Sequence, residues 1–222
     1  MWCVTFPAGP WHTNCYLVAP EAGAPCVVID PGVGSADQVR QLLAQEKIDV
    51  VGIVATHGHI DHIYGAEELC RELDVPLWIH PDDEHLLTDP LAGLGGDAAQ
   101  LLMSFHGSTT LTAPPRVEHL THGQTLTLAE LPFEQRLAPG HTAGSVLLTL
   151  TDVAEQPVTF TGDVVFAGSV GRTDLPGGDT DTLMTSVREQ VLTLPTETVL
   201  LPGHGPATTL AAERESNPFF PR

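Results

Sequence analysis

The first 80 residues alternate between short apolar runs and segments with helical spacing. Val39, Leu42 and Leu43 share one face of a helix that would begin at the capping residue Ser35. The apolar runs predict strands at residues 2–6, 14–19, 25–30, 49–56 and 76–80, and helical spacing predicts helices at 35–47 and 64–74. Strands that alternate with helices in this way predict an α/β fold built in layers.

Apolar runs return in the second half of the chain, after a looser stretch at residues 81–115. They predict strands at 125–129, 133–138, 145–151, 157–163 and 197–203, and helices at about 181–193 and 206–215. The looser stretch combines Gly93, Gly95 and Gly96 with the apolar run LLMSF. We interpret it as an insertion or a mobile lid over a substrate cleft.

The composition fits one domain over residues 1–222, because 42% hydrophobic content is enough for one sizeable core. A formal charge of −19 argues against nucleic acid and against an anionic membrane as partners, and favours a small-molecule substrate. No apolar stretch is long enough for a transmembrane helix, and the N-terminus lacks the pattern of a signal peptide. The four cysteines show no CxxC spacing, so we expect reduced thiols in a cytoplasmic protein, whose oligomeric state stays open.

The most informative segment is VATHGHIDHIYGA, residues 54–66, which follows a buried apolar run. His57, His59, Asp61 and His62 place four nitrogen or carboxylate donors at the end of a predicted strand. Such a concentration suits a divalent metal, and it exceeds what a single proton shuttle needs. The plain alternative is a polar loop whose histidines are incidental.

In three later segments, an apolar run again lies next to a histidine or aspartate that could bind a metal, and each of these residues has a glycine beside it. The segments are LAPGHTAGS with His141, TFTGDVVF with Asp163 and LLPGHGP with His204. Glycine allows close approach of the backbone and unusual dihedral angles at such points. Each segment is a weak signal alone, but together with the first they predict a metal centre.

These motifs resemble those of the metallo-β-lactamase superfamily, because THGHIDH matches the THxHxDH signature and the later ligands follow in the same order. The resemblance covers nearly the whole chain and implies a four-layer αββα sandwich with the metals at one edge. It implies that His57, His59 and His141 hold the first metal, that Asp61, His62 and His204 hold the second, and that Asp163 bridges both.

The chemistry of the donors agrees with a dinuclear centre. A carboxylate has two oxygens and can bridge, and two metals about 3.5–4 Å apart hold a hydroxide that attacks a carbonyl at neutral pH. Asp61 and Asp163 are therefore the catalytic candidates, with zinc as the favoured metal and iron or manganese as alternatives. Asp30, in an IDPG turn, is either a hydrogen-bond acceptor for a ligand histidine or a simple turn residue.

Two further segments narrow the function by resemblance. GRTD, residues 171–174, and the tail GHGPATTLAAERESNPF are similar to the glyoxalase II group and its short bacterial forms. That group implies hydrolysis of a thioester such as S-lactoylglutathione or a related hydroxyacyl-thiol. Arg172 is the substrate-binding candidate, and its alternative role is a salt bridge with Asp174.

Two other functions stay open at this point. Persulfide dioxygenases share the fold and the GRTD segment, and would use one iron on His57, His141 and Asp163. An inactive metal-binding scaffold is the non-enzymatic alternative, which the complete set of seven ligands disfavours.

Overall fold

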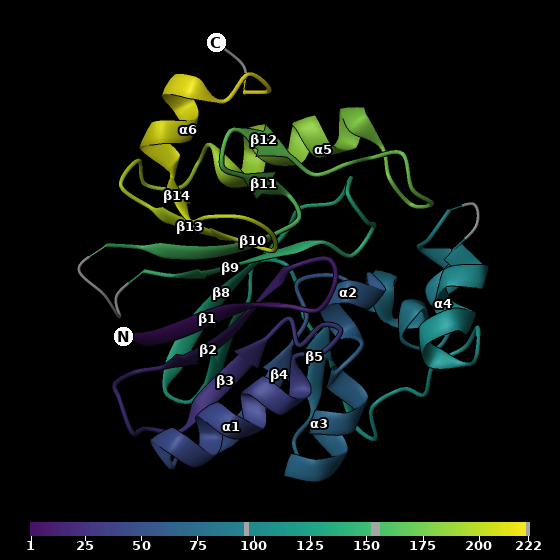
Figure 1. Ribbon diagram of the computed structural model, residues 1–222. Helices are drawn as coiled ribbons and strands as arrows, with labels where there is room; N and C mark the ends of the chain where they lie inside the picture. The colour runs from purple at the N-terminus through teal and green to yellow at the C-terminus, as the bar shows by residue number, and fades with distance from the viewer. Residues whose placement is uncertain (96–97, 152–155, 221–222) are drawn as a thin grey trace.

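The computed structural model describes residues 1–95, 98–151 and 156–220, and shows two sheets packed face to face between helices (Figure 1). The first sheet has six strands in chain order: β1 (Trp2–Ala8), β2 (Thr13–Ala19), β3 (Cys26–Ile29), β4 (Val50–Val54), β5 (Leu77–Ile79) and β6 (Val117–His119). The second runs in the order β14 (Thr208–Thr209), β13 (Val199–Pro202), β10 (Val158–Gly162), β9 (Val146–Leu150), β8 (Leu131–Leu137) and β7 (Thr125–Leu128).

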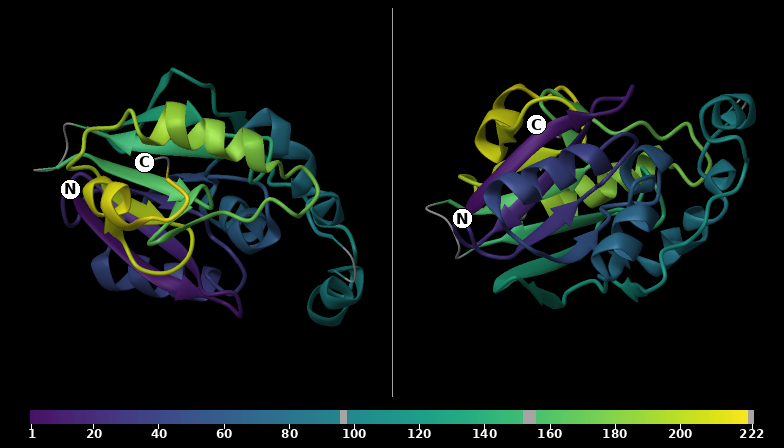
Figure 2. Two further views of the ribbon diagram at one scale, coloured as in Figure 1. Left: turned by 90° about the horizontal axis from the view of Figure 1, so that it is seen from above. Right: turned by 60° about the horizontal axis from the view of Figure 1, so that its bottom comes forward.

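Helices cover the outer face of each sheet. The first sheet is covered by α1 (Ala36–Glu46), α2 (Ile60–Ile63) and α3 (Ala66–Leu73), and the second by α5 (Thr180–Ser186) and α6 (Leu210–Ser216). This arrangement confirms the αββα sandwich. The views in Figure 2 show α4 (Ala98–His106) standing out from the side of the body.

Three apolar layers hold the sandwich together, and the period of two along a strand explains how one strand serves two of them. In β2, Leu17 packs towards the helices while Tyr16 and Val18 pack between the sheets. In β9, Leu147 packs against α5, while Val146 and every second residue after it in the strand face the first sheet. Strands buried on both faces read as continuous apolar runs, as this sequence has them. The assignment of residues 1–222 to one domain stays a prediction.

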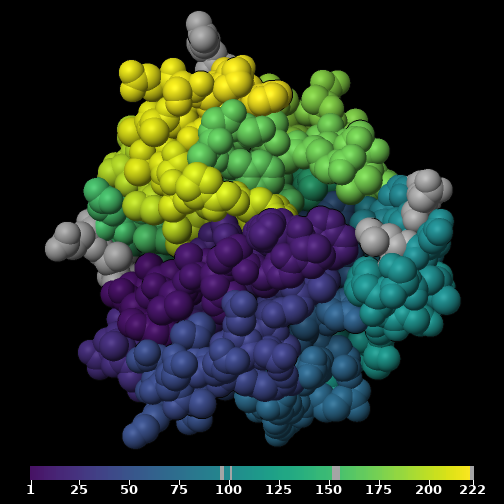
Figure 3. All heavy atoms as spheres, viewed as in Figure 1, coloured from purple at the N-terminus to yellow at the C-terminus, as the bar shows by residue number. Residues whose placement is uncertain are grey.

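The strand directions bring four distant segments to one edge. The strands from β3 to β6 are parallel neighbours, and β10 is parallel to β13 but antiparallel to β9. The carboxyl ends of β10 and β13 therefore lie beside the start of β9. A hydrogen bond from the amide of Val146 to the carbonyl of Thr56, 2.9 Å, joins this edge to the end of β4. On the surface, the purple N-terminal segment lies along the yellow C-terminal one (Figure 3), where the amide of Asn14 donates to the carbonyl of Gly203 at 2.7 Å.

Several elements differ in detail from the sequence prediction. The helix expected at about 181–193 is α only to Ser186 and continues as a π-helical turn over Val187–Val191. The helix expected at 206–215 begins later, at Leu210, because β14 comes first and the side chain of Thr209 caps the helix by accepting from Ala212. The short strands β6, β11 (Val165–Phe166), β12 (Ser169–Val170) and β14 were not predicted, since their two or three residues do not form an apolar run that stands out from its surroundings. None of the described helices is long and apolar enough to cross a bilayer.

Candidate metal centre

All seven predicted ligands meet at the edge where the strand ends converge. Residues 57–62 follow β4, His141 lies in the loop before β9, Asp163 follows β10 and His204 follows β13. Their donor atoms form three overlapping groups, within each of which the atoms lie within 4.8 Å of one another. The fold thus gathers residues that are up to 147 positions apart in the sequence, from His57 to His204.

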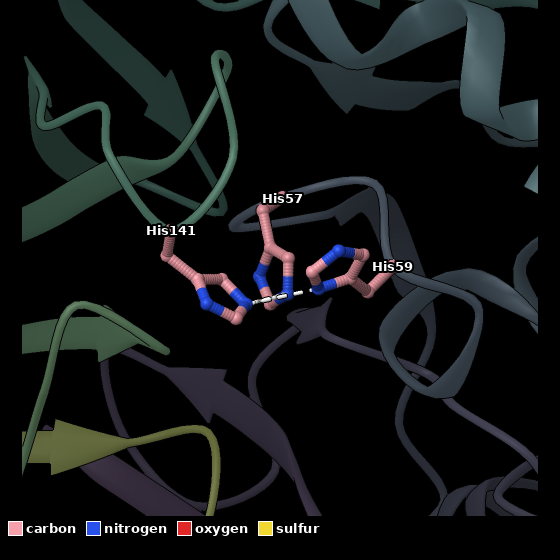
Figure 4. Close-up of side chains that lie close together, drawn as sticks. All are labelled: His57, His59 and His141. Atoms are coloured by element: carbon pink, nitrogen blue, oxygen red, sulfur yellow. Dashed lines mark hydrogen bonds between the residues drawn. The ribbon is translucent and has the colours of Figure 1, made fainter. Parts of the chain in front are cut away.

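The first ligand set is His57, His59 and His141, whose rings point towards one another (Figure 4). His141 Nε2 lies 2.9 Å from His59 Nδ1 and 3.2 Å from His57 Nε2. A neutral imidazole has one donor and one acceptor nitrogen. The outer nitrogens of His57 and His141 already donate to other groups, so the inner nitrogens of these two rings have no proton to offer each other. A shared cation is the partner that such a group of lone pairs fits.

Outer hydrogen bonds fix where the lone pairs point. His141 Nδ1 donates to the backbone carbonyl of Arg172 at 2.8 Å, which leaves Nε2 as the lone-pair nitrogen. His204 Nδ1 lies 3.1 Å from the carbonyl of Trp11, with the same consequence. His62 Nδ1 faces Asp30 Oδ2 at 2.9 Å. Since carbonyls and carboxylates only accept, these three histidines donate outwards from Nδ1 and turn Nε2 towards the centre, as metal-binding histidines do.

Asp30 performs both roles that the sequence left open. It adopts the left-handed backbone of a turn, with φ of 53°, and its carboxylate accepts from the Thr56 amide and hydroxyl, each at 2.7 Å, and from His62. The Thr56 hydroxyl gives its proton to Asp30, so it accepts from His57 Nδ1 at 3.1 Å. One buried carboxylate therefore orients a histidine in each ligand set.

The second ligand set is Asp61, His62 and His204. Asp61 Oδ2 lies 3.2 Å from His204 Nε2 and 3.5 Å from His62 Nε2, and it accepts a hydrogen bond of 3.0 Å from the Thr13 hydroxyl. Thr13, at the start of β2, was not identified from the sequence, because a threonine at a strand end carries no motif of its own.

Asp163 lies between the two sets. Its Oδ1 is 3.4 Å from His62 Nε2, and its Oδ2 is 3.6 Å from His141 Nε2 and 3.5 Å from His204 Nε2. The carboxylate therefore faces one histidine of the first set and two of the second. This is the placement that a bridging ligand requires.

The histidines of the two sets differ in their affinity for protons. Burial and the neighbouring rings lower the pKa of His57 well below its usual value, and burial followed by the charge of His141 lowers the pKa of His59 to about 4. Burial also acts on His62 and His204, but nearby carboxylates outweigh it and raise both pKa values. Burial and neighbouring rings therefore disfavour the protonated form of His57 and His59, whereas the nearby carboxylates favour the protonated form of His62 and His204.

The two carboxylates stay ionised. Burial alone would raise the pKa of Asp61 and of Asp163, but the positive charge of His62 and its neighbours lowers both below the usual value. Three buried atoms of the centre, His59 Nε2, His62 Nε2 and Asp163 Oδ1, have no hydrogen-bond partner. Unpaired buried polar atoms are costly unless they have another partner. With nitrogen and carboxylate donors, this centre fits zinc or iron.

A buried carboxylate that the sequence analysis missed connects the loops of the first set. Asp83, in the 3₁₀ helix Pro81–Leu87, accepts from the amide of Gly58 at 2.8 Å, the amide of Gly144 at 2.8 Å and the hydroxyl of Thr142 at 2.7 Å. Gly58 lies between two ligands, and the other two donors follow His141. In the sequence, only the run of acidic residues after a strand could have suggested this role of Asp83.

A cavity of about 480 Å³ opens onto the centre and is lined by His59, Asp61, His141, Asp163 and His204. Arg172 also lines it, and its guanidinium forms two hydrogen bonds of 2.7 and 2.8 Å with Asp174, so both suggested roles of Arg172 have a structural basis. Leu94, Leu102 and Phe105 from the 81–115 segment line the cavity, as a lid would. Gly96 lies outside the described residues, and the mobility of the segment stays a prediction.

The comparisons with known proteins agree with this geometry. The family model of the metallo-beta-lactamase superfamily matches residues 8–204. An uncharacterized protein of Mycobacterium tuberculosis is 38% identical over 97% of this chain and 96% of its own length. The hydroxyacylglutathione hydrolase GloC of Haemophilus influenzae is 33% identical over 96% of this chain and 95% of its own.

Two solved structures are similar over nearly their whole length. BLEG-1 B3 metallo-beta-lactamase is 34% identical, with a TM-score of 0.85, over 98% of this chain and 99% of that chain. TTHA1623, solved in a di-iron-bound form, is 36% identical, with a TM-score of 0.78, over 99% and 100%.

Proposed function

The chain belongs to the metallo-β-lactamase superfamily, and from this premise we propose that it is a dinuclear metal-dependent hydrolase that cleaves a small hydroxyacyl thioester. The observation that carries the proposal is Asp163, whose two carboxylate oxygens face two separate ligand sets at 3.4–3.6 Å. The similarity to GloC over nearly the full chain supports a thioester as the substrate.

In this proposal, His57, His59 and His141 would hold one cation, Asp61, His62 and His204 would hold the other, and Asp163 would be shared. Two bound divalent cations, zinc being our first choice, supply Lewis acidity that polarises a carbonyl and makes water nucleophilic near neutral pH. Hydrolysis of a thioester adds water to the acyl carbon, breaks the carbon–sulfur bond and releases an acid and a thiol.

The chain's own residues then have separate tasks. Asp163 and Asp61 keep negative charge beside the reacting carbonyl, and the Thr13 hydroxyl at 3.0 Å holds Asp61 in place. Asp30 and the carbonyls of Arg172 and Trp11 keep the histidine lone pairs directed inwards. The cavity beside the centre receives the rest of the substrate.

The test combines metal analysis of protein purified without added metal with an assay on S-lactoylglutathione. We expect two metal ions per chain and thioester cleavage that is lost on chelation and restored by metal. His119→Gln is a control for loss of a histidine outside the centre, because His119 is half-exposed in β6 and pairs with Glu84. It should leave the metal content and the thioester cleavage unchanged. One iron per chain, with oxygen uptake on a persulfide and no thioester cleavage, would refute the proposal and favour a dioxygenase.

A further inference from the structure

The cavity beside the metal centre is apolar on the sides that do not carry ligands. Its apolar lining includes residues from three parts of the chain, namely Trp11, Leu102, Phe105, Phe166, Val170 and Leu175. The rings of Trp11 and Phe105 meet edge to face, with centroids 6.1 Å apart, so the turn after β1 and helix α4 together close one side. A cavity built in this way stabilises an apolar group by removing it from water.

Beyond the proposed cations, the lining of the same cavity offers little positive charge. Among the described residues that line it, Arg172 is the only lysine or arginine, and its guanidinium is bound by both oxygens of Asp174. A substrate carboxylate would have to compete with Asp174 for this group, and a second carboxylate would meet no lysine or arginine. The formal charge of −19 also repels anions as they approach.

We propose that the thiol half of the substrate is uncharged and apolar, which disfavours glutathione with its two carboxylates. This inference rests on the proposed thioester hydrolysis and names the class of thiol that the same site takes. The acyl group lies at the ligand side chains, and the thiol substituent lies between α4, the turn after β1 and the segment from Phe166 to Leu175.

The experiment compares three thioesters of lactate with the metal-loaded protein. The thiols are glutathione, glutathione diethyl ester, which has the same frame without carboxylates, and benzyl mercaptan, which is neutral and apolar. We expect kcat/KM for the benzyl thioester to exceed that for the glutathione thioester at least about tenfold, or 1.4 kcal/mol, with the diethyl ester between them. Added salt should raise kcat/KM only for the glutathione thioester, because it screens repulsion.

Two substitutions test the part played by charge. Asp174→Asn frees Arg172 and should raise kcat/KM several-fold for the glutathione thioester alone. Asp181→Asn removes the same charge from an exposed position outside the cavity, and should leave kcat/KM unchanged for the glutathione and the benzyl thioester. Phe105→Ala should lower kcat/KM for the benzyl thioester selectively, because it opens the apolar side.

The outcomes separate this inference from the function on which it rests. Cleavage of all three thioesters with glutathione equal or preferred, together with selective loss of that activity in Arg172→Met, would overturn the apolar-thiol inference and leave the hydrolase proposal standing. No cleavage of any of the three by protein that holds two metals would overturn the hydrolase proposal and the inference with it.

Discussion

Replacing Asp83 with asparagine tests how the first ligand set is assembled. The Asp83 carboxylate is 1% exposed, and it joins the loop that carries His57 and His59 to the loop that carries His141. The loops approach so closely that a Cβ atom on Gly144 would lie 2.7 Å from the Asp83 carboxyl carbon. Asp83 is thus a positioning residue. It holds together the loops that carry the first ligand set, and it is not itself one of the ligands.

The size of the effect follows from the three hydrogen bonds. A hydrogen bond to a charged acceptor contributes about 1.5–3 kcal/mol, and a buried donor left unpaired costs about 1–3 kcal/mol. Asparagine keeps one acceptor oxygen, which can serve the Gly58 amide and the Thr142 hydroxyl. Its amide group would then face the Gly144 amide, two donors together. We therefore expect a loss of about 2–4 kcal/mol in the free energy of unfolding of the metal-free protein.

The assay is denaturant unfolding of the metal-free protein, paired with metal titration of the folded protein. Asp83→Asn should weaken binding of the first cation more than about tenfold, because His141 and His59 no longer hold their separation. Asp82→Asn is the matched control, since its neighbouring carboxylate is 56% exposed, and it should cost less than about 0.5 kcal/mol. Equal unfolding free energies and equal metal affinities in the two variants would refute the reasoning.

The remaining predictions concern the centre itself. Asp163→Asn should lower hydrolysis about 10²–10⁴-fold and reduce the metal count, since a neutral amide compensates neither cation. His204→Ala should lower both quantities less. A larger loss in His204→Ala than in Asp163→Asn, by elemental analysis and kinetics, would contradict the bridging role of Asp163. Gly203→Ala should lower both Tm and metal content, because its Cβ would lie 2.2 Å from Asp163 Oδ1; unchanged calorimetry and stoichiometry would count against this contact. As the pH is lowered, the second cation should leave first, because the raised pKa values of His62 and His204 make protons compete with metal there, whereas the pKa of His59 is lowered to about 4. Metal analysis after dialysis at each pH would contradict this if both cations left together.

Much of the fold followed from the sequence because its strands are buried on both faces. Runs such as NCYLVA and PCVVID are continuous in apolar residues, and the structure places strands at Thr13–Ala19 and Cys26–Ile29. The elements that were missed or shifted carry little local signal. The strand Val117–His119 has three residues, and the π-helical turn after Ser186 depends on packing rather than on a residue type.

The ligand types were readable because four of them lie within six consecutive residues, and because glycine-flanked turns mark the others. A motif of this density leaves few chemical alternatives, so residue type and spacing suffice to predict seven candidate donors, which the structure brings together. Their convergence depends on the parallel pairing of β10 with β13 and the antiparallel pairing with β9, which no single segment encodes.

What surrounds the ligands was decided by tertiary structure alone. His141 and His204 are oriented by the backbone carbonyls of Arg172 and Trp11, and a carbonyl is present at every residue, so it leaves no trace in the sequence. Asp83 holds two loops that are more than 80 residues apart, and its importance arises only when both amides point at it. The sequence by itself determined which atoms can bind a metal, because donor chemistry belongs to side-chain type. The fold decided which of those atoms meet, how their protons are placed and what kind of cavity lies beside them, because these depend on contacts between distant segments.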